Sequence, residues 1–175
     1  DTTLVAKGHL LGQEEILLHT EDDRNQTVQK FLQQSTKSQQ PITREEKGAF
    51  VFLKGADFTY TFDRRTGLFS QLCFGGKNYF DWPMELNIWR APTDNDMYLK
   101  KEWKKAYYHA AYARAYGTVV EQTKNGVVLT TKLAVLAPAV QRILEAGVIW
   151  KIDRDGKIAS TWEVVRKEEF PALPR

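Results

Sequence analysis

"FTYTFDRRTGLFSQLCFGGKNYF", residues 58–80, carries the clearest structural signal in the chain. Phe58, Tyr60 and Phe62 recur at every second position, which is the period of a β-strand with one buried face. The next residues, "DRRTG" at 63–67, are typical of a turn because the glycine can adopt a positive φ. A second apolar run follows the turn, so the stretch predicts an antiparallel β-meander.

Three dipeptides repeat this pattern of strand, turn and strand. They are Gly-Gly at 75–76, Asn-Gly at 125–126 and Asp-Gly at 155–156, each between apolar or β-branched runs. Around the last of them, Trp150 and Ile152 alternate with polar neighbours, as in a half-buried strand. The sequence therefore predicts a mainly β fold, an antiparallel β-sandwich with one short helix.

The helix is expected within residues 99–116, where Trp103 and Ala106 begin an apolar series at helical spacing. The Asp-Asn-Asp run at 94–96 precedes it. Such side chains accept hydrogen bonds from the free N–H groups of a first turn, and their charge suits the helix dipole. Gly117 is favourable just after a helix end.

A polar segment divides the chain. Residues 21–42 are rich in Gln, Ser and Thr and poor in large apolar side chains, so we expect a linker there. Residues 1–20 contain "LVAKGHLLGQEEILL" and are expected to form a strand or a bent pair. Residues 43–175 are the expected main domain. A start at Asp rather than Met, and an end directly after strand-like sequence, predict a piece of a longer protein.

Composition limits the possible functions. The chain has 175 residues, 42% of them hydrophobic, and 25 basic against 22 acidic residues give a net charge of +3, which requires no polyanionic partner. Cys73 is the single cysteine, which excludes an internal disulfide and suits a reducing compartment. It lies among apolar strand residues and is expected to be buried and inert. No apolar run approaches the roughly 20 residues that span a bilayer. We therefore expect a cytoplasmic protein without membrane contact.

Asp94 and Asp96 are the first candidates for catalysis. Glycoside hydrolysis uses two carboxyl groups roughly 5–10 Å apart on opposite sides of the bond. Carboxylates two residues apart on a tight turn diverge, so helix capping is favoured. A calcium loop starting at Asp94 would need Gly at its sixth and Glu at its twelfth position, which are Leu99 and Lys105 here. One cysteine and three scattered histidines argue against zinc.

Nucleic-acid binding is a further candidate. Lysines at 100, 101, 104 and 105 and Arg114 interleave with aromatic side chains, which can bind phosphates and stack on bases. An amphipathic helix, with its aromatic face packed and its lysines solvated, gives the same pattern. The balanced overall charge favours this structural interpretation.

Residues 86–115, "LNIWRAPTDNDMYLKKEWKKAYYHAAYARA", resemble the signature of the large β-galactosidases of glycoside hydrolase family 2. The specific part is the run from Arg90 through Asp94, Asn95 and Asp96, followed by Trp103. The stretch 58–80 is similar to the start of that family's last domain, and "KGHLLGQEEILL" resembles the end of the immunoglobulin-like domain before it. The resemblance implies a supersandwich of the galactose-mutarotase type, present incompletely.

The resemblance also implies what this chain lacks. The family's two catalytic glutamates, and its Mg²⁺ and Na⁺, belong to a barrel domain upstream of these residues. We therefore expect no catalytic residue, metal or cofactor here, and no activity of the chain alone. The family has a loop beside its sugar pocket, and the corresponding residues are Asp96, Met97, Tyr98, Leu99 and Lys100. Tyr98 stands where members with a mobile loop have Gly, which departs from the hinge pattern.

The resemblance therefore implies a non-catalytic, pocket-supporting domain of an enzyme that hydrolyses terminal β-D-galactosides. Its partners would be the remaining domains of that enzyme and, there only, the galactoside. The alternative is a carbohydrate- or partner-binding β-sandwich module without a hydrolase parent. Self-association is also expected, through apolar residues left uncovered on the late hairpin: Trp150, Ile152, Trp162 and Val164.

Overall fold

The computed structural model describes residues 9–10, 12–14, 16, 26, 29–30, 38–138 and 140–174. The chain divides into two compact units, residues 1–34 and 35–175. The following account concerns the second unit. The strand expected in residues 1–20 and most of the linker expected at 21–42 lie outside the described residues, so those two predictions stay predictions.

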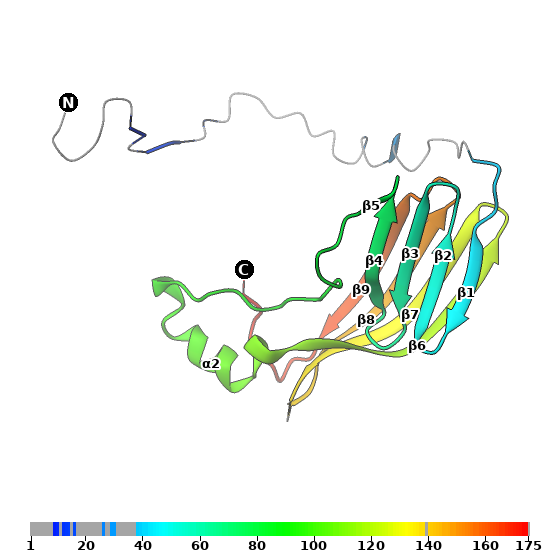
Figure 1. Ribbon diagram of the computed structural model, residues 1–175. Helices are drawn as coiled ribbons and strands as arrows, with labels where there is room; N and C mark the ends of the chain where they lie inside the picture. Colours follow the sequence, from blue (N-terminus) through cyan, green and yellow to red (C-terminus); the bar gives the residue numbers. More distant parts are fainter. Residues whose placement is uncertain are drawn as a thin grey trace. The chain divides into compact units, whose positions relative to one another are not determined.

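The first sheet has five antiparallel strands in chain order (Figure 1). They are β1 (Thr43–Lys47), β2 (Phe50–Lys54), β3 (Phe58–Asp63), β4 (Leu68–Phe74) and β5 (Lys77–Asn78). The meander expected from residues 58–80 is therefore confirmed, with turns at the predicted places. Gly67 has a φ of 77°, which explains the glycine there. Cys73 on β4 is half-buried rather than buried, because it lies near the sheet edge beside the two-residue strand β5.

The second sheet has four antiparallel strands, also in chain order. They are β6 (Tyr112–Thr123), β7 (Gly126–Ala137), β8 (Val140–Asp153) and β9 (Ile158–Arg166). The Asn-Gly and Asp-Gly signals mark the β6–β7 and β8–β9 hairpins as predicted. Within the described residues no helix is long and apolar enough to cross a membrane.

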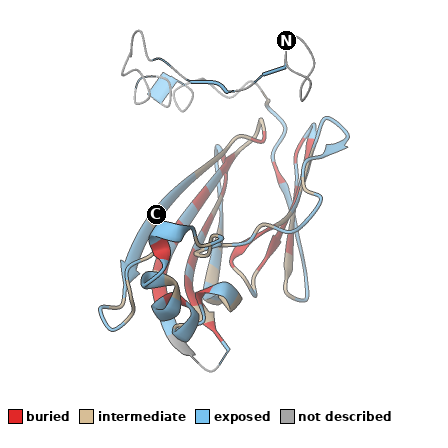
Figure 2. Cartoon of the chain, turned by 90° about the vertical axis from the view of Figure 1, so that its left-hand side faces the viewer, coloured by how far each residue is buried: buried red, intermediate tan, exposed pale blue. Residues whose placement is uncertain are grey.

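The two sheets share one hydrophobic core, and Figure 2 shows buried residues on both. Phe69 of the first sheet meets the ring of Trp150 edge to face, with centroids 5.2 Å apart. Trp150 and Ile152 are only 5% and 2% exposed, so the expectation that they lie uncovered is wrong. The reason is that the first sheet covers β7 and β8. At the edge strand β9, Trp162 is half-buried and Val164 is 52% exposed.

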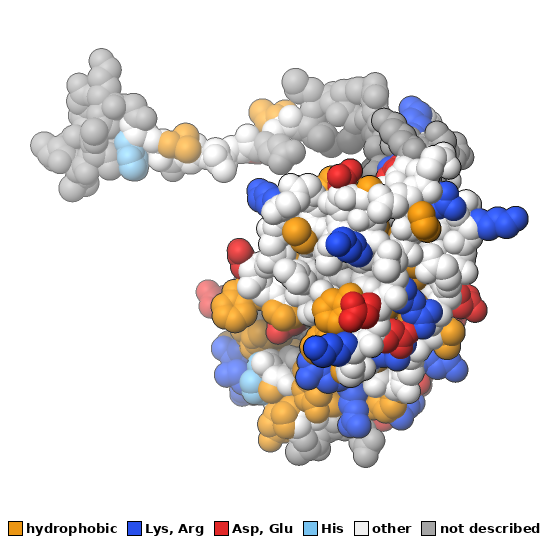
Figure 3. All heavy atoms as spheres, turned by 45° about the vertical axis from the view of Figure 1, so that its right-hand side comes forward, with side chains coloured by type: hydrophobic (Ala, Val, Ile, Leu, Met, Phe, Trp, Pro, Cys, Tyr) orange, Lys and Arg blue, Asp and Glu red, His pale blue; other side chains and the backbone are white. Residues whose placement is uncertain are grey.

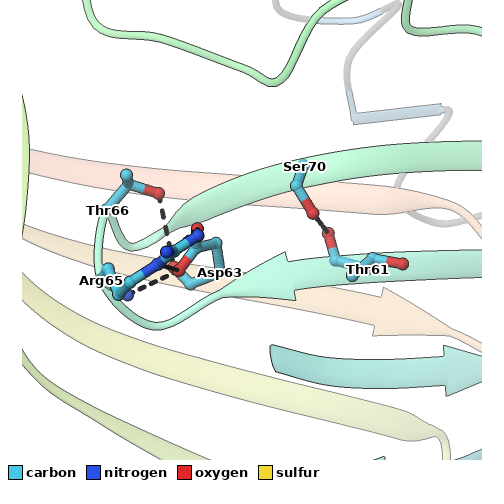
Figure 4. A network of polar contacts seen from close by, with 5 residues as sticks. All are labelled: Thr61, Asp63, Arg65, Thr66 and Ser70. Carbon is cyan, nitrogen blue, oxygen red and sulfur yellow. Dashed lines mark hydrogen bonds and ion pairs between the residues drawn. The ribbon is translucent and has the colours of Figure 1, made fainter. Parts of the chain in front are cut away.

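The tip of the β3–β4 hairpin fastens one sheet to the other. The Arg65 backbone and side chain donate hydrogen bonds to the Asp63 carboxylate, as Figure 4 shows. Ala115 N–H of β6 donates to the Arg65 carbonyl at 2.7 Å, and Trp150 Nε1 donates to the Gly67 carbonyl at 3.3 Å. Burial raises the pKa of Asp63, but the Arg65 hydrogen bonds outweigh it and lower that pKa overall.

The helix prediction is only partly right. A 3₁₀ turn, η1 (Asp94–Asp96), is followed by α2 (Leu99–Lys105) and a second 3₁₀ turn, η2 (Tyr108–Ala110). The helix ends because Tyr107 takes the left-handed conformation, with φ 57° and ψ 30°. Residues 112–116 belong to strand β6, where alternate alanines face the core. Gly117 lies in that strand, next to a register shift, and does not end a helix.

Candidate functional site

The Arg90–Asp96 ion pair is the centre of the motif that the sequence singled out. Arg90 Nη1 and Nη2 donate to the two carboxylate oxygens of Asp96 at 2.6 and 2.9 Å. The Thr93 N–H and Oγ1 also donate to Asp96, at 2.8 and 3.0 Å. These bonds close residues 90–96 into a compact loop with a buried carboxylate at its centre.

The capping prediction needs correction for two of the three residues. Thr93, not Asp94, is the N-cap of η1, and Tyr98 occupies that position before α2. Asp94 and Asn95 are exposed within η1, whereas Asp96 is buried and accepts a hydrogen bond from the Thr93 backbone N–H. The Asp96 carboxylate therefore serves both as a partner of the arginine and in the cap, and it is the buried side chain of η1.

The Asp96 carboxylate is held in its ionised form. Arg90's hydrogen bonds, followed by that of the Thr93 backbone, lower the pKa of Asp96 to about 2. A group with this pKa carries no proton to donate near neutral pH, and its oxygens already accept four hydrogen bonds. Asp96 is therefore suited to anchoring a loop and not to general acid catalysis.

A second hydrophobic core lies under this motif. Trp103 of α2 and Tyr108 of η2 are 2% and 1% exposed, and the Arg90 guanidinium lies 5.5 Å from the centroid of the Trp103 ring. Side chains from the ends of β7 and β8 complete the buried cluster: Val135, Ala137, Ile143 and Leu144. The sequence predicted a helix with a packed aromatic face and solvated lysines. Trp103 and Tyr108 are buried and the lysines at 101, 104 and 105 are exposed, as expected, but Tyr107, Tyr112 and Tyr116 are 43%, 47% and 49% exposed, so the prediction is right only in part.

The loop beyond Asp96 presents apolar side chains to solvent. Met97, Tyr98 and Leu99 are 49%, 77% and 47% exposed, and Lys100 is half-buried. The structure thus places the five residues of the expected pocket loop together, with Asp96 inward and the next three outward. Large exposed apolar side chains in sequence are typical of a contact surface.

A shallow groove of about 350 Å³ lies beside the motif. It is lined by Asn87, Ile88, Trp89, Arg90, Leu173 and Pro174. The Trp89 ring meets Trp103 and His109 edge to face, at 6.4 and 5.6 Å between centroids. Most of this lining is apolar, and Arg90 is bonded to Asp96, so the groove offers no nucleophile or free carboxylate.

A larger groove, of about 410 Å³, lies on the second sheet. Arg142 is 4.3 Å from the centroid of the Tyr116 ring and 3.1 Å from Glu145 Oε1. Arg142 and Glu145, two of the charged residues that line this groove, are therefore paired with each other. Over the described residues, no cluster of three potential metal ligands occurs. On the face drawn in Figure 3, basic and acidic side chains are interspersed.

The sequence indicated no role for the segment Phe170–Pro174 and did not show that Tyr108 binds it. Tyr108 Oη donates to the Pro171 carbonyl at 2.6 Å, and Trp103 Nε1 donates to the Ala172 carbonyl at 2.8 Å. Phe170 and Leu173 pack on the second core. The segment has no periodic pattern of apolar residues that could have predicted these contacts. Its position depends on hydrogen bonds from the distant side chains of Tyr108 and Trp103 to its backbone.

The architecture is that of a mainly β domain that carries a helical loop module at one end. Comparison with known proteins identifies it further. The family described as "Beta galactosidase small chain" matches residues 54–175, and the chain belongs to that family.

Three similar proteins are each called a β-galactosidase. The one from Actinobacillus pleuropneumoniae is 33% identical over 174 residues, which is 99% of this chain and 17% of that protein. The one from Staphylococcus xylosus is 26% identical over 152 residues, 87% of this chain and 15% of that protein. The one from Lactobacillus delbrueckii subsp. bulgaricus is 32% identical over 127 residues, 70% of this chain and 12% of that protein. The chain thus spans less than a fifth of the length of these relatives.

Proposed function

We propose that this chain is a non-catalytic part of a β-galactosidase and that its loop Asp96–Lys100 forms one wall of the pocket for terminal β-D-galactosides. The observation that carries the proposal is the exposed run Met97, Tyr98 and Leu99 directly after the buried anchor Asp96. An anchored backbone with outward apolar side chains can pack on a sugar ring or on a neighbouring domain at little cost in ordering entropy. Membership of the small-chain family supports the galactosidase context.

The chemistry in this proposal comes from elsewhere in the enzyme. The catalytic carboxylates, and the Mg²⁺ and Na⁺ that the resemblance implies, would be held by other domains, which are also the proposed partners of this chain. Asp96, with a pKa of about 2 and its oxygens engaged, supports a role in shape rather than proton transfer. A cytoplasmic location stays a prediction that rests on the single cysteine.

The test is a substitution in the galactosidase that contains this chain. Tyr98→Ala should raise KM for a chromogenic galactoside about tenfold, corresponding to about 1.4 kcal/mol of lost contact energy. Tyr79→Ala is the matched control, because Tyr79 is also an exposed tyrosine (60%) but lies beyond β5 of the first sheet. Equal kinetics for Tyr98→Ala, Tyr79→Ala and the unsubstituted enzyme would refute the pocket-wall role. It would leave the alternative, a β-sandwich module that binds another carbohydrate or partner.

A further inference from the structure

We infer that the segment Phe170–Pro174 is a strap that positions the loop Asp96–Lys100, with Tyr108 and Trp103 as its positioning residues. The inference rests on the proposed function for its kinetic consequence, because the loop matters to catalysis only if it borders the pocket. The structural part of the inference, that the strap restrains the loop, stands on contacts within this chain.

The strap is held by side chains rather than by a sheet. Its carbonyls at Pro171 and Ala172 accept hydrogen bonds from Tyr108 Oη (2.6 Å) and Trp103 Nε1 (2.8 Å). A proline has no N–H to donate to a strand ladder, so the segment cannot extend the sheet as a regular strand. Phe170 and Leu173 add apolar contacts to the same buried cluster.

The contacts continue from the strap to the loop. Trp103 lies one helical turn after Leu99, and its ring lies under the Arg90 guanidinium. Arg90 in turn holds both oxygens of Asp96, the first residue of the loop. Asp96 is therefore linked to Trp103 through Arg90. The end of the loop at Lys100 belongs to the same helix as Trp103, and the strap accepts the hydrogen bond of the Trp103 indole N–H.

The groove beside Arg90 also brings the strap and the anchor of the loop together. Leu173 and Pro174 of the strap line it together with Trp89 and Arg90. If the strap moves away, the buried indole of Trp103 becomes accessible to water, and the Arg90 side chain, already 36% exposed, becomes more exposed. Water that competes for the guanidinium weakens its pairing with Asp96, and the loop gains freedom without unfolding of the two sheets.

Tyr108→Phe and Tyr60→Phe form a matched pair for the experiment. Both tyrosines are buried, and both donate to a backbone carbonyl, Tyr108 at 2.6 Å and Tyr60 to Gly156 at 2.7 Å. Tyr60 lies in the core between the sheets, away from the loop. Each substitution removes one hydroxyl and keeps the ring, so the two variants should lose similar global stability.

Hydrogen exchange of the 175-residue chain is the direct readout. In Tyr108→Phe we expect amide exchange within residues 96–105 to accelerate about fivefold more than exchange in β2 and β3. In Tyr60→Phe we expect no such local excess. The inference is wrong if exchange within residues 96–105 accelerates equally in both variants, or if it is unchanged in Tyr108→Phe.

The kinetic arm separates the strap from the pocket wall. In the galactosidase that contains this chain, Tyr108→Phe should raise KM about threefold and Tyr60→Phe should leave it unchanged. If the loop amides exchange faster in Tyr108→Phe but KM stays the same, the strap restrains the loop and the pocket-wall proposal is refuted. If Tyr98→Ala raises KM but Tyr108→Phe leaves the exchange of the loop amides unaltered, the pocket-wall proposal is supported and the strap inference is refuted.

Discussion

Gly126, the first residue of β7, allows a sharp test of the hairpin that joins β6 to β7. Its φ is +153°, and a Cβ atom there would lie 1.9 Å from the carbonyl oxygen of Ile152. That oxygen belongs to the backbone of β8, which cannot move aside without disturbing the pairing of Gly126 with Asp153. An alanine at this position therefore combines backbone strain with a clash.

The expected cost can be built from these two effects. A backbone conformation reserved for glycine costs about 1–3 kcal/mol when another residue adopts it. Displacing the strand end loses about one hydrogen bond, which contributes roughly 1 kcal/mol. Gly126→Ala should then destabilise the domain by about 3 kcal/mol, which lowers the midpoint of thermal unfolding by roughly 6–12 °C at this chain length.

Two other glycines supply the controls. Gly75 has a φ of +56° with open space around its Cβ direction, so Gly75→Ala isolates backbone strain and should cost about 1 kcal/mol. Gly147 has neither a positive φ nor a close neighbour, so Gly147→Ala should be near neutral. Urea unfolding followed by circular dichroism ranks the three variants. If Gly126→Ala falls within 0.5 kcal/mol of Gly147→Ala, roughly the scatter of such surface changes, the register assigned to β7 and β8 is wrong.

The remaining predictions concern activity, pH, a buried hydroxyl and association. The chain alone should not hydrolyse a chromogenic galactoside; turnover that disappears on Asp94→Asn would contradict this. Asp96 has a folded pKa of about 2, below its ordinary value of 3.8, so its contribution to stability is complete above pH 4 and is lost as the pH falls towards 2. Asp96→Asn should therefore weaken the pH dependence of the unfolding midpoint between pH 4 and pH 2. A midpoint that depends on pH in the same way in the variant and the unsubstituted chain would refute the pairing. Tyr60→Phe should cost about 1 kcal/mol, because the Gly156 carbonyl loses its donor; an equal unfolding free energy in urea would argue against the bond. The chain should self-associate through the edge strand β9, where Val164 is 52% exposed; sedimentation as a monomer at high micromolar concentration, equal to that of Val164→Lys, would exclude it.

The turns and the strands beside them were predictable because their signals are local. Gly67 has the positive φ that its turn suggested, and the Asn-Gly and Asp-Gly pairs fall at the hairpins of the second sheet. Trp150 could be assigned to a buried strand face by alternation, but the sheet that covers it could not be identified. That pairing depends on how two sheets distant in sequence face each other, which periodicity does not encode.

The end of helix α2 could not be predicted from local signals. The spacing from Trp103 onward favours a helix through Tyr116, yet the chain turns at Tyr107 and extends from Tyr112. The same residues, "YARAYG", alternate between exposed Tyr or Arg and alanine, so they also fit a strand with Ala113 and Ala115 inward. Tertiary pairing with β7 decides between the two patterns, since short segments of mixed period carry no strong preference of their own.

The ion pair of Arg90 was predictable only in part. A half-buried arginine requires a carboxylate or carbonyl partner, so a nearby aspartate could be expected. The sequence does not indicate which of the two aspartates is buried; in the structure Asp96 is buried and Asp94 is exposed. The contribution of the strap was not predictable either, because it depends on two side chains that lie more than 60 positions away in the sequence.

The two cores of the domain have different consequences for function. The core between the sheets is closed by ladders of backbone hydrogen bonds and by large buried side chains, so it opens only with global unfolding. The core around Trp103 and Tyr108 is a smaller cluster of buried apolar side chains, closed by side-chain bonds to the carbonyls of a proline-containing segment and by the Arg90–Asp96 ion pair. Opening it exposes less apolar surface and breaks fewer hydrogen bonds than separating the sheets, so its free energy of local opening should lie below that of the sheets. A loop mounted on such a core can therefore shift locally while the two sheets keep their register.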